Sequence, residues 1–87
     1  MLSRRLGQLR ADLALADEQL AHFADESDDA RLRALVSETP LAEHEHREAE
    51  RHSSAMARHR DDLVELIAKL ESEQDALLDK LTSRRRS

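Results

Sequence analysis

The sequence contains few of the residues that cross-link a small protein or fill a globular core. Its 87 residues contain no cysteine, no tryptophan and no tyrosine, and only one glycine, one proline and one phenylalanine. The absence of cysteine excludes a disulfide-stabilised scaffold, and so short a chain with one aromatic ring cannot fill a broad globular core. No apolar run is long enough to span a membrane, so we expect no membrane partner.

Charged residues, leucine and alanine dominate instead. Charged residues make up 38% of the chain, a composition typical of long helices and coiled coils. The net charge is −5 and is divided into acidic blocks at 16–30 and 61–79 and basic segments at both ends. Nucleic acid is therefore expected only as a nonspecific contact through the basic ends. The preference for arginine over lysine suggests a GC-rich bacterial genome, and with no secretory pattern we expect a cytoplasmic protein.

The first third of the chain carries a heptad pattern. Its apolar residues alternate spacings of four and three, which is the seam of a coiled coil and predicts a helix over residues 2–25. The polar stretch 25–29 then predicts a break or kink, with Ser27 or Asp28 capping a short helix at 28–37. Leu32, Leu35 and Val36 would form the packed face of that short helix.

A long helix is predicted after Thr39 and Pro40. Threonine is a good N-cap and proline suits the first helical position, and neither glycine nor proline follows before Leu81. Leucine, methionine and alanine recur every seven residues from Ala42 to Leu77, which predicts one helix over residues 40–82. Residues 84–87 would form a basic tail.

The two stripes match each other if the chain reverses near Thr39. Residues whose numbers add to about 79 then face each other, and apolar meets apolar at each step. We therefore predict an all-α fold, a coiled-coil-like antiparallel helical hairpin forming one domain over residues 1–83. A complete break at Ser27, with the short helix as a third bundle member, is the alternative. The predicted seam residues are Leu6, Leu9, Leu13, Leu20, Phe23, Met56, Leu63, Leu66, Leu70 and Leu77.

Apolar residues beside the seam predict self-association. Leu15, Val64 and Leu78 widen the apolar face beyond what one helix covers. Pairing of two hairpins into a helical bundle would bury these side chains and would stabilise a small chain.

A histidine-rich segment is the candidate for metal chemistry. His44, Glu48 and His52 are four apart and share one helical face, a spacing that permits metal ligation. Arg47 and Arg51 can pair with neighbouring carboxylates and would repel a metal ion. We therefore expect a salt-bridged face, with no metal and no cofactor. His52 and His59 are expected at or beside the seam, where their protonation would make it pH-sensitive.

Charged segments are the candidates for partner binding. In a hairpin the basic chain ends meet, so Arg84, Arg85 and Arg86 would join Arg4, Arg5 and Arg10 at one pole. Asp25 and Asp28 mark the acidic stretch. Asp25-x-x-Asp28-x-Ala30 resembles the acidic tip motif of the DksA-type coiled-coil factors that enter the secondary channel of RNA polymerase. That family places the motif at the hairpin turn and adds a cysteine-rich zinc domain, so the resemblance assigns no family here.

These patterns predict an elongated helical fold. They contain no arrangement of residues typical of a catalytic site. A helix surface offers no oxyanion donors, because its backbone amides are already bonded. We expect a non-enzymatic interaction or adaptor protein that self-associates as a dimer or higher and binds a protein partner through its charged surfaces. A small regulator of the transcription or translation machinery and a His/Glu metal-binding bundle are the two alternatives.

Overall fold

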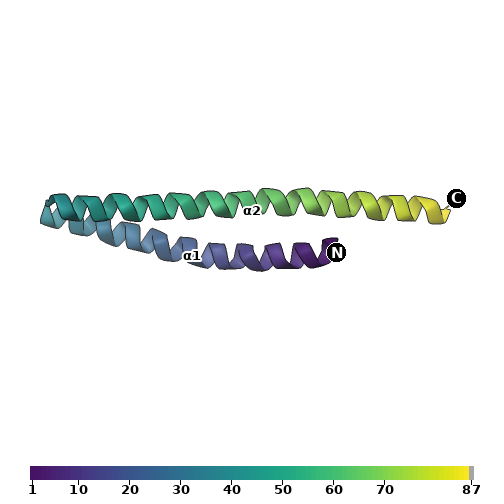
Figure 1. Cartoon of the computed structure of the whole chain (residues 1–87), viewed down its shortest axis with the longest axis horizontal. Coiled ribbons are helices and arrows are strands. Elements are labelled where there is room, and N and C mark those ends of the chain that lie inside the picture. Colours follow the sequence, from purple (N-terminus) through teal and green to yellow (C-terminus); the bar gives the residue numbers. More distant parts are fainter. Residues whose placement is uncertain (87) are drawn as a thin grey trace.

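The protein is a hairpin of two long helices. The computed structural model describes the backbone of residues 1–86 and the side chains of residues 1–85. Helix α1 spans Leu2–Ser37 and helix α2 spans Pro40–Arg86, and they run antiparallel in a rod of 73 × 15 × 14 Å (Figure 1). The predicted all-α helical hairpin is confirmed, and the described part of the chain contains no strand.

The turn between the two helices consists of only two residues, Glu38 and Thr39. Glu38 ends α1 in the left-handed conformation, at φ 51° and ψ 33°, and its N–H donates to the carbonyl oxygen of Ala34 at 3.0 Å. The hydroxyl of Thr39 accepts the N–H of Ala42 at 3.2 Å, and Pro40 is the first helical residue of α2. The predicted start of the long helix at Thr39 and Pro40 is confirmed.

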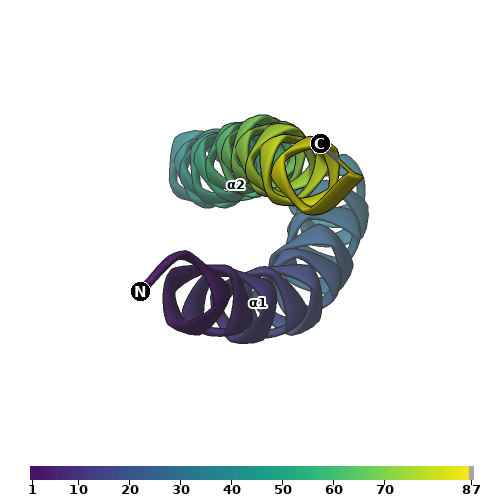
Figure 2. The same cartoon turned by 90° about the vertical axis from the view of Figure 1, so that its right-hand side faces the viewer.

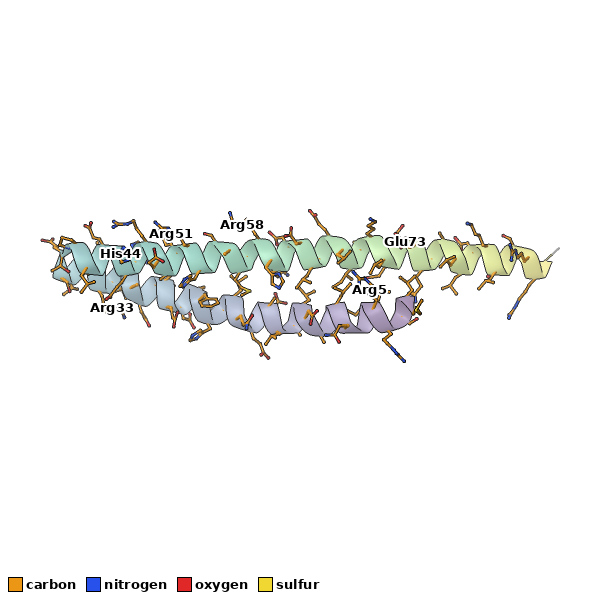
Figure 3. The ribbon with its side chains drawn as sticks, viewed as in Figure 1. Arg5, Arg33, His44, Arg51, Arg58 and Glu73 are labelled. Carbon is orange, nitrogen blue, oxygen red and sulfur yellow. The ribbon has the colours of Figure 1, made fainter. Side chains whose placement is uncertain are left out.

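The core lies toward the end of the hairpin opposite the turn. Leu6 is the most buried large side chain, with 1% of its surface exposed, and Figure 3 shows side chains of both helices filling the space between the ribbons. Branched aliphatic residues here bury much more area than the alanines near the turn. The buried cluster consists of Leu6, Leu9, Ala16, Leu63, Ile67 and Leu70, with Leu2, Leu13, Met56 and Leu66 packed against it.

Helix α1 does not break at residues 25–29. It is one helix to Ser37, so the predicted separate helix at 28–37 and the three-helix alternative are both wrong. The spacings of four and three continue beyond Phe23 through Ser27, Ala30 and Ala34, and Ala30 is only 2% exposed. Figure 1 shows α1 curving over this stretch without interruption. Small residues thus maintain the seam where large apolar residues stop.

The register is offset slightly from the expected one. Because the chain reverses between Glu38 and Thr39, residues whose numbers add to about 77, and not 79, are opposite each other. The contacts between Ser3 and Gln74 and between Asp17 and Arg60 agree with this centre. The helices also wind about each other, as Figures 1 and 2 show together, which a seam repeating every 3.5 residues imposes.

Helix α2 is longer than its partner. It continues beyond the predicted end at residue 82 to Arg86, and Figure 1 shows its C-terminal part projecting past the start of α1. Leu77 was predicted in the seam, but 53% of its surface is exposed. The reason is that α1 begins opposite Gln74, so no helix covers α2 beyond that point. Of the predicted tail, residues 84–86 are helical and Ser87 lies outside the described residues.

Candidate functional site

Polar side chains occupy one column of the α2 seam. His46, Ser53, Arg60 and Gln74 are separated by multiples of seven residues, and each is partly buried against α1. Polar residues at such positions reduce stability but specify the register and the number of strands in a coiled coil. The seam therefore encodes which residues of α1 and α2 face each other, in addition to holding them together.

Two inter-helix contacts fix that register. The guanidinium Nε of Arg60 donates to the Asp17 carboxylate at 2.6 Å, and the Gln74 amide donates to the Ser3 hydroxyl at 3.1 Å. The hydrogen bond to Asp17 and the charge of its carboxylate raise the pKa of Arg60 above its usual value. The side chains of Arg60 and Asp17 are still 38% and 50% exposed, so their ion pair contributes to specificity more than to stability.

The histidine-rich segment is a solvated polar face. His44 and His52 are exposed, and Glu48 forms its ion pair with Arg51 and not with a histidine. Figure 3 shows Arg51 projecting from α2 on the side away from α1. Within residues 1–85, no three His, Cys, Asp or Glu side chains are placed to hold a metal ion. The spacing of His44, Glu48 and His52 is therefore not accompanied by a ligand cluster.

Of the two histidines expected at or beside the seam, His52 lies beside it and His59 does not, and a further histidine, His46, lies within it. His59 is exposed, and His52 lies at the seam margin, with its ring centroid 5.8 Å from that of Phe23. His46 is instead the seam residue, with 23% of its side chain exposed and Nε2 3.1 Å from the Glu50 carboxylate. His46 lies near the turn, where it lines a depression with Arg31, Ala34 and Leu35 of α1.

An acidic and apolar stripe lies on the outer face of α1 near the turn. Asp25, Asp29, Leu32 and Val36 follow spacings of four, three and four on the side opposite the seam. The exposed fractions of Leu32, Leu35 and Val36 are 57%, 67% and 85%. Their predicted packing as the inner face of a short helix is wrong. We call this stripe the tip surface, made up of Asp25, Asp28, Asp29, Leu32, Leu35 and Val36.

A basic and apolar stripe lies on the projecting end of α2. Leu77, Leu78 and Leu81 are each 53–56% exposed. Leu77, Lys80, Leu81 and Arg84 line a depression in this end of the helix. We call it the overhang surface, made up of Leu77, Leu78, Lys80, Leu81, Arg84 and Arg85.

The basic ends are neighbours but do not form a single cluster. The overhang carries Arg84 and Arg85 beyond the start of α1, where Arg4 and Arg5 are located (Figure 1). Arg10 is 3.8 Å from the Glu71 carboxylate of α2. The side chain of Arg86, also predicted at this pole, lies outside the described residues. The predicted positive pole is thus extended along the rod axis.

The acidic motif is part of a helix. Asp25, Asp28 and Ala30 lie within α1 and not at the turn, and Ala30 is buried in the seam. The structure therefore separates the aspartates, which face solvent, from the alanine, which packs against α2. This differs from a motif displayed as a unit at a hairpin tip.

Comparison of the chain with models of protein families, with curated proteins and with solved structures found no match. Among the described residues, neither helix has a stretch apolar and long enough to cross a membrane.

Proposed function

We propose that the protein is a non-enzymatic coiled-coil module that self-associates and then presents its charged faces to a protein partner. The observation that carries this proposal is the pair of apolar stripes left uncovered by the hairpin. Leu32, Leu35 and Val36 near the turn, and Leu77, Leu78 and Leu81 at the other end, are all more than half exposed. Grouped exposed apolar residues with polar rims mark interaction sites on proteins.

The arrangement of polar groups supports a binding role. Arg60 forms an ion pair with Asp17 between the helices, and Arg51 forms one with Glu48 within α2. Both ion pairs are accessible to solvent. Charges of this kind contribute little to stability but direct association and discriminate between partners. Charged groups are also grouped along the rod: Asp25, Asp28 and Asp29 lie on the tip surface beside Arg31 and Arg33, and Lys80, Arg84 and Arg85 lie on the overhang surface beside Asp79.

Self-association is tested by sedimentation equilibrium. We expect the average mass of the untagged protein to rise above 9.9 kDa as its concentration increases from micromolar to millimolar. The association should be weak. A stripe of three apolar residues is too small to bury the area of a standard interface, which is about 800 Å² per partner. A mass that stays at the monomer value throughout, in a protein that is fully helical by circular dichroism, would contradict the proposal.

A further inference from the structure

We propose that a groove along one side of the hairpin, in the half near the turn, binds a basic amphipathic helix of another protein. This inference rests on the partner binding through charged surfaces proposed above, and it specifies the site and the chemistry of that partner. The groove is made up of two adjoining depressions of about 510 Å³ and about 330 Å³, and His52 lines both. We call it the side groove. Figure 3 marks its walls near the turn by Arg33 on α1 and His44 on α2.

The side groove exists because the residues between the helices are small or polar here. Ala30 of α1 is 2% exposed and Ala49 of α2 is partly buried, and both line the groove. At the other end of the hairpin, Leu66 packs against the buried cluster. Leu66 is separated from Glu45 and His52 by multiples of seven residues, so the three share one column of α2. Near the turn, this column provides no large apolar side chain, and the side of the seam stays open.

One end of the side groove is apolar. Phe23, Ala55, Met56 and His52 line it, and Phe23 and Met56 are only partly buried. The rings of Phe23 and His52 meet across the two helices, with centroids 5.8 Å apart. A phenyl ring beside a flexible thioether forms a contact surface that adapts to the shape of an aliphatic side chain. This end therefore suits an apolar side chain of the partner.

The other end of the side groove carries carboxylates on both walls. Its charged lining residues are four acids and one base: Glu26, Asp29, Glu45, Glu48 and Arg33. Glu48 forms an ion pair with Arg51. Glu26 accepts from Nε2 of His22 at 3.1 Å. The two other acids, Asp29 on α1 and Glu45 on α2, form none of the ion pairs found among residues 1–85. Two carboxylates on opposite walls are therefore available to a guanidinium or ammonium group of the partner.

The two ends of the side groove are spaced like residues on one face of a helix. Ala55 and Glu48 are about 10 Å apart along the axis of α2, and Glu45 is about 5 Å further from Ala55. A partner helix with a leucine, and with arginines seven and eleven positions away, presents these side chains on one face at matching distances. Both depressions open along the side of the rod, so they form a surface for a packed helix and do not enclose a small molecule. Charge complementarity selects a basic helix.

A designed peptide tests this site. The probe is a fluorescein-labelled, alanine-based helical peptide with one leucine and with arginines seven and eleven positions after it. We expect fluorescence anisotropy to show that it binds the native protein, and that Glu45→Lys weakens binding about tenfold. Glu65→Lys makes the same change in net charge at an exposed position of α2 outside the groove, and should weaken binding less than about twofold. A second peptide with serine in place of the leucine should bind the native protein about fivefold more weakly.

The other outcomes would overturn the side groove. Equal weakening by Glu45→Lys and Glu65→Lys, or equal binding of the two peptides, would mean attraction to the charge of the whole chain, and binding through charged surfaces would stand without the groove. Failure of the native protein to bind the probe would also overturn it, as would a loss of self-association in Glu45→Lys, because a second copy would then occupy the groove. Circular dichroism should show unchanged helicity in both variants, since both positions are exposed. Sedimentation of the native chain without peptide reports separately on the self-association proposed above.

Discussion

Leu6→Asp is expected to abolish the folded hairpin, whereas Leu15→Asp in the same helix should leave it folded. Leu6 is 1% exposed at the centre of the buried cluster, and Leu15 is 53% exposed beside it. An unpaired carboxylate buried among leucines costs several kcal/mol. The core of so small a domain supplies only about 3–5 kcal/mol of net stability. The first substitution therefore exceeds the stability available, and the second does not.

Far-UV circular dichroism during heating compares the two variants directly. We expect Leu6→Asp to have low helicity and no cooperative transition, and Leu15→Asp to have a transition close to that of the native protein. Equal loss of helicity in both would mean that the buried stripe of α1 is not the one described here.

Ala30→Leu is expected to destabilise the hairpin by about 1–3 kcal/mol, the usual cost of overpacking a close contact. Ala30 is 2% exposed where α1 packs on α2 near the turn. The added methyl groups have no space there unless the helices separate. The cost is specific to an unbroken α1, because in a separate or frayed segment a leucine would be tolerated or favoured.

Ala21→Leu is the matched control, because Ala21 is in the same helix but exposed. Leucine and alanine have similar helix propensities, so this change should shift stability by less than about 0.5 kcal/mol. Urea unfolding followed by circular dichroism measures both. If Ala30→Leu had the same midpoint as the control, residues 25–34 would not be packed on α2 as the structure has them.

The hairpin itself was predictable because two separate stripes of large apolar residues each indicate a helix with a packed face. The stripe from Leu2 to Phe23 and the stripe from Met56 to Leu70 have the same spacing and bury most of the apolar area. Thr39 and Pro40 then locate the start of the second helix. These signals depend on local chemistry and spacing, which are read from a single sequence.

The continuity of α1 was harder to predict because its seam changes in residue size. Ser27, Ala30 and Ala34 have the right spacing but little hydropathy, while the aspartates between them suggest a loop. Those aspartates face solvent, where a helix tolerates them. Once Ala30 and Ala34 take the inner face, Leu32 and Val36 must point outward, and this is why the tip surface was missed. The spacing of Ser27, Ala30 and Ala34 is the signal that could have revealed it.

The exact register depended on the turn. Glu38 adopts a positive φ, which is uncommon for a residue with a β-carbon, so the sequence alone favoured a reversal one residue later. That difference moves the facing residues by about two positions. It leaves Leu77 beyond the start of α1, and the overhang surface follows from it.

A disulfide between the far ends of the two helices tests the hairpin most directly. Ser3 and Gln74 are 71 positions apart in the sequence, and their side chains are 3.1 Å apart in the structure. Oxidation of the Ser3→Cys, Gln74→Cys double variant at high dilution should give a cross-linked product that has the monomer mass under denaturing conditions. Cross-linking only between separate chains, or none at all, would contradict a chain that folds back on itself along its full length.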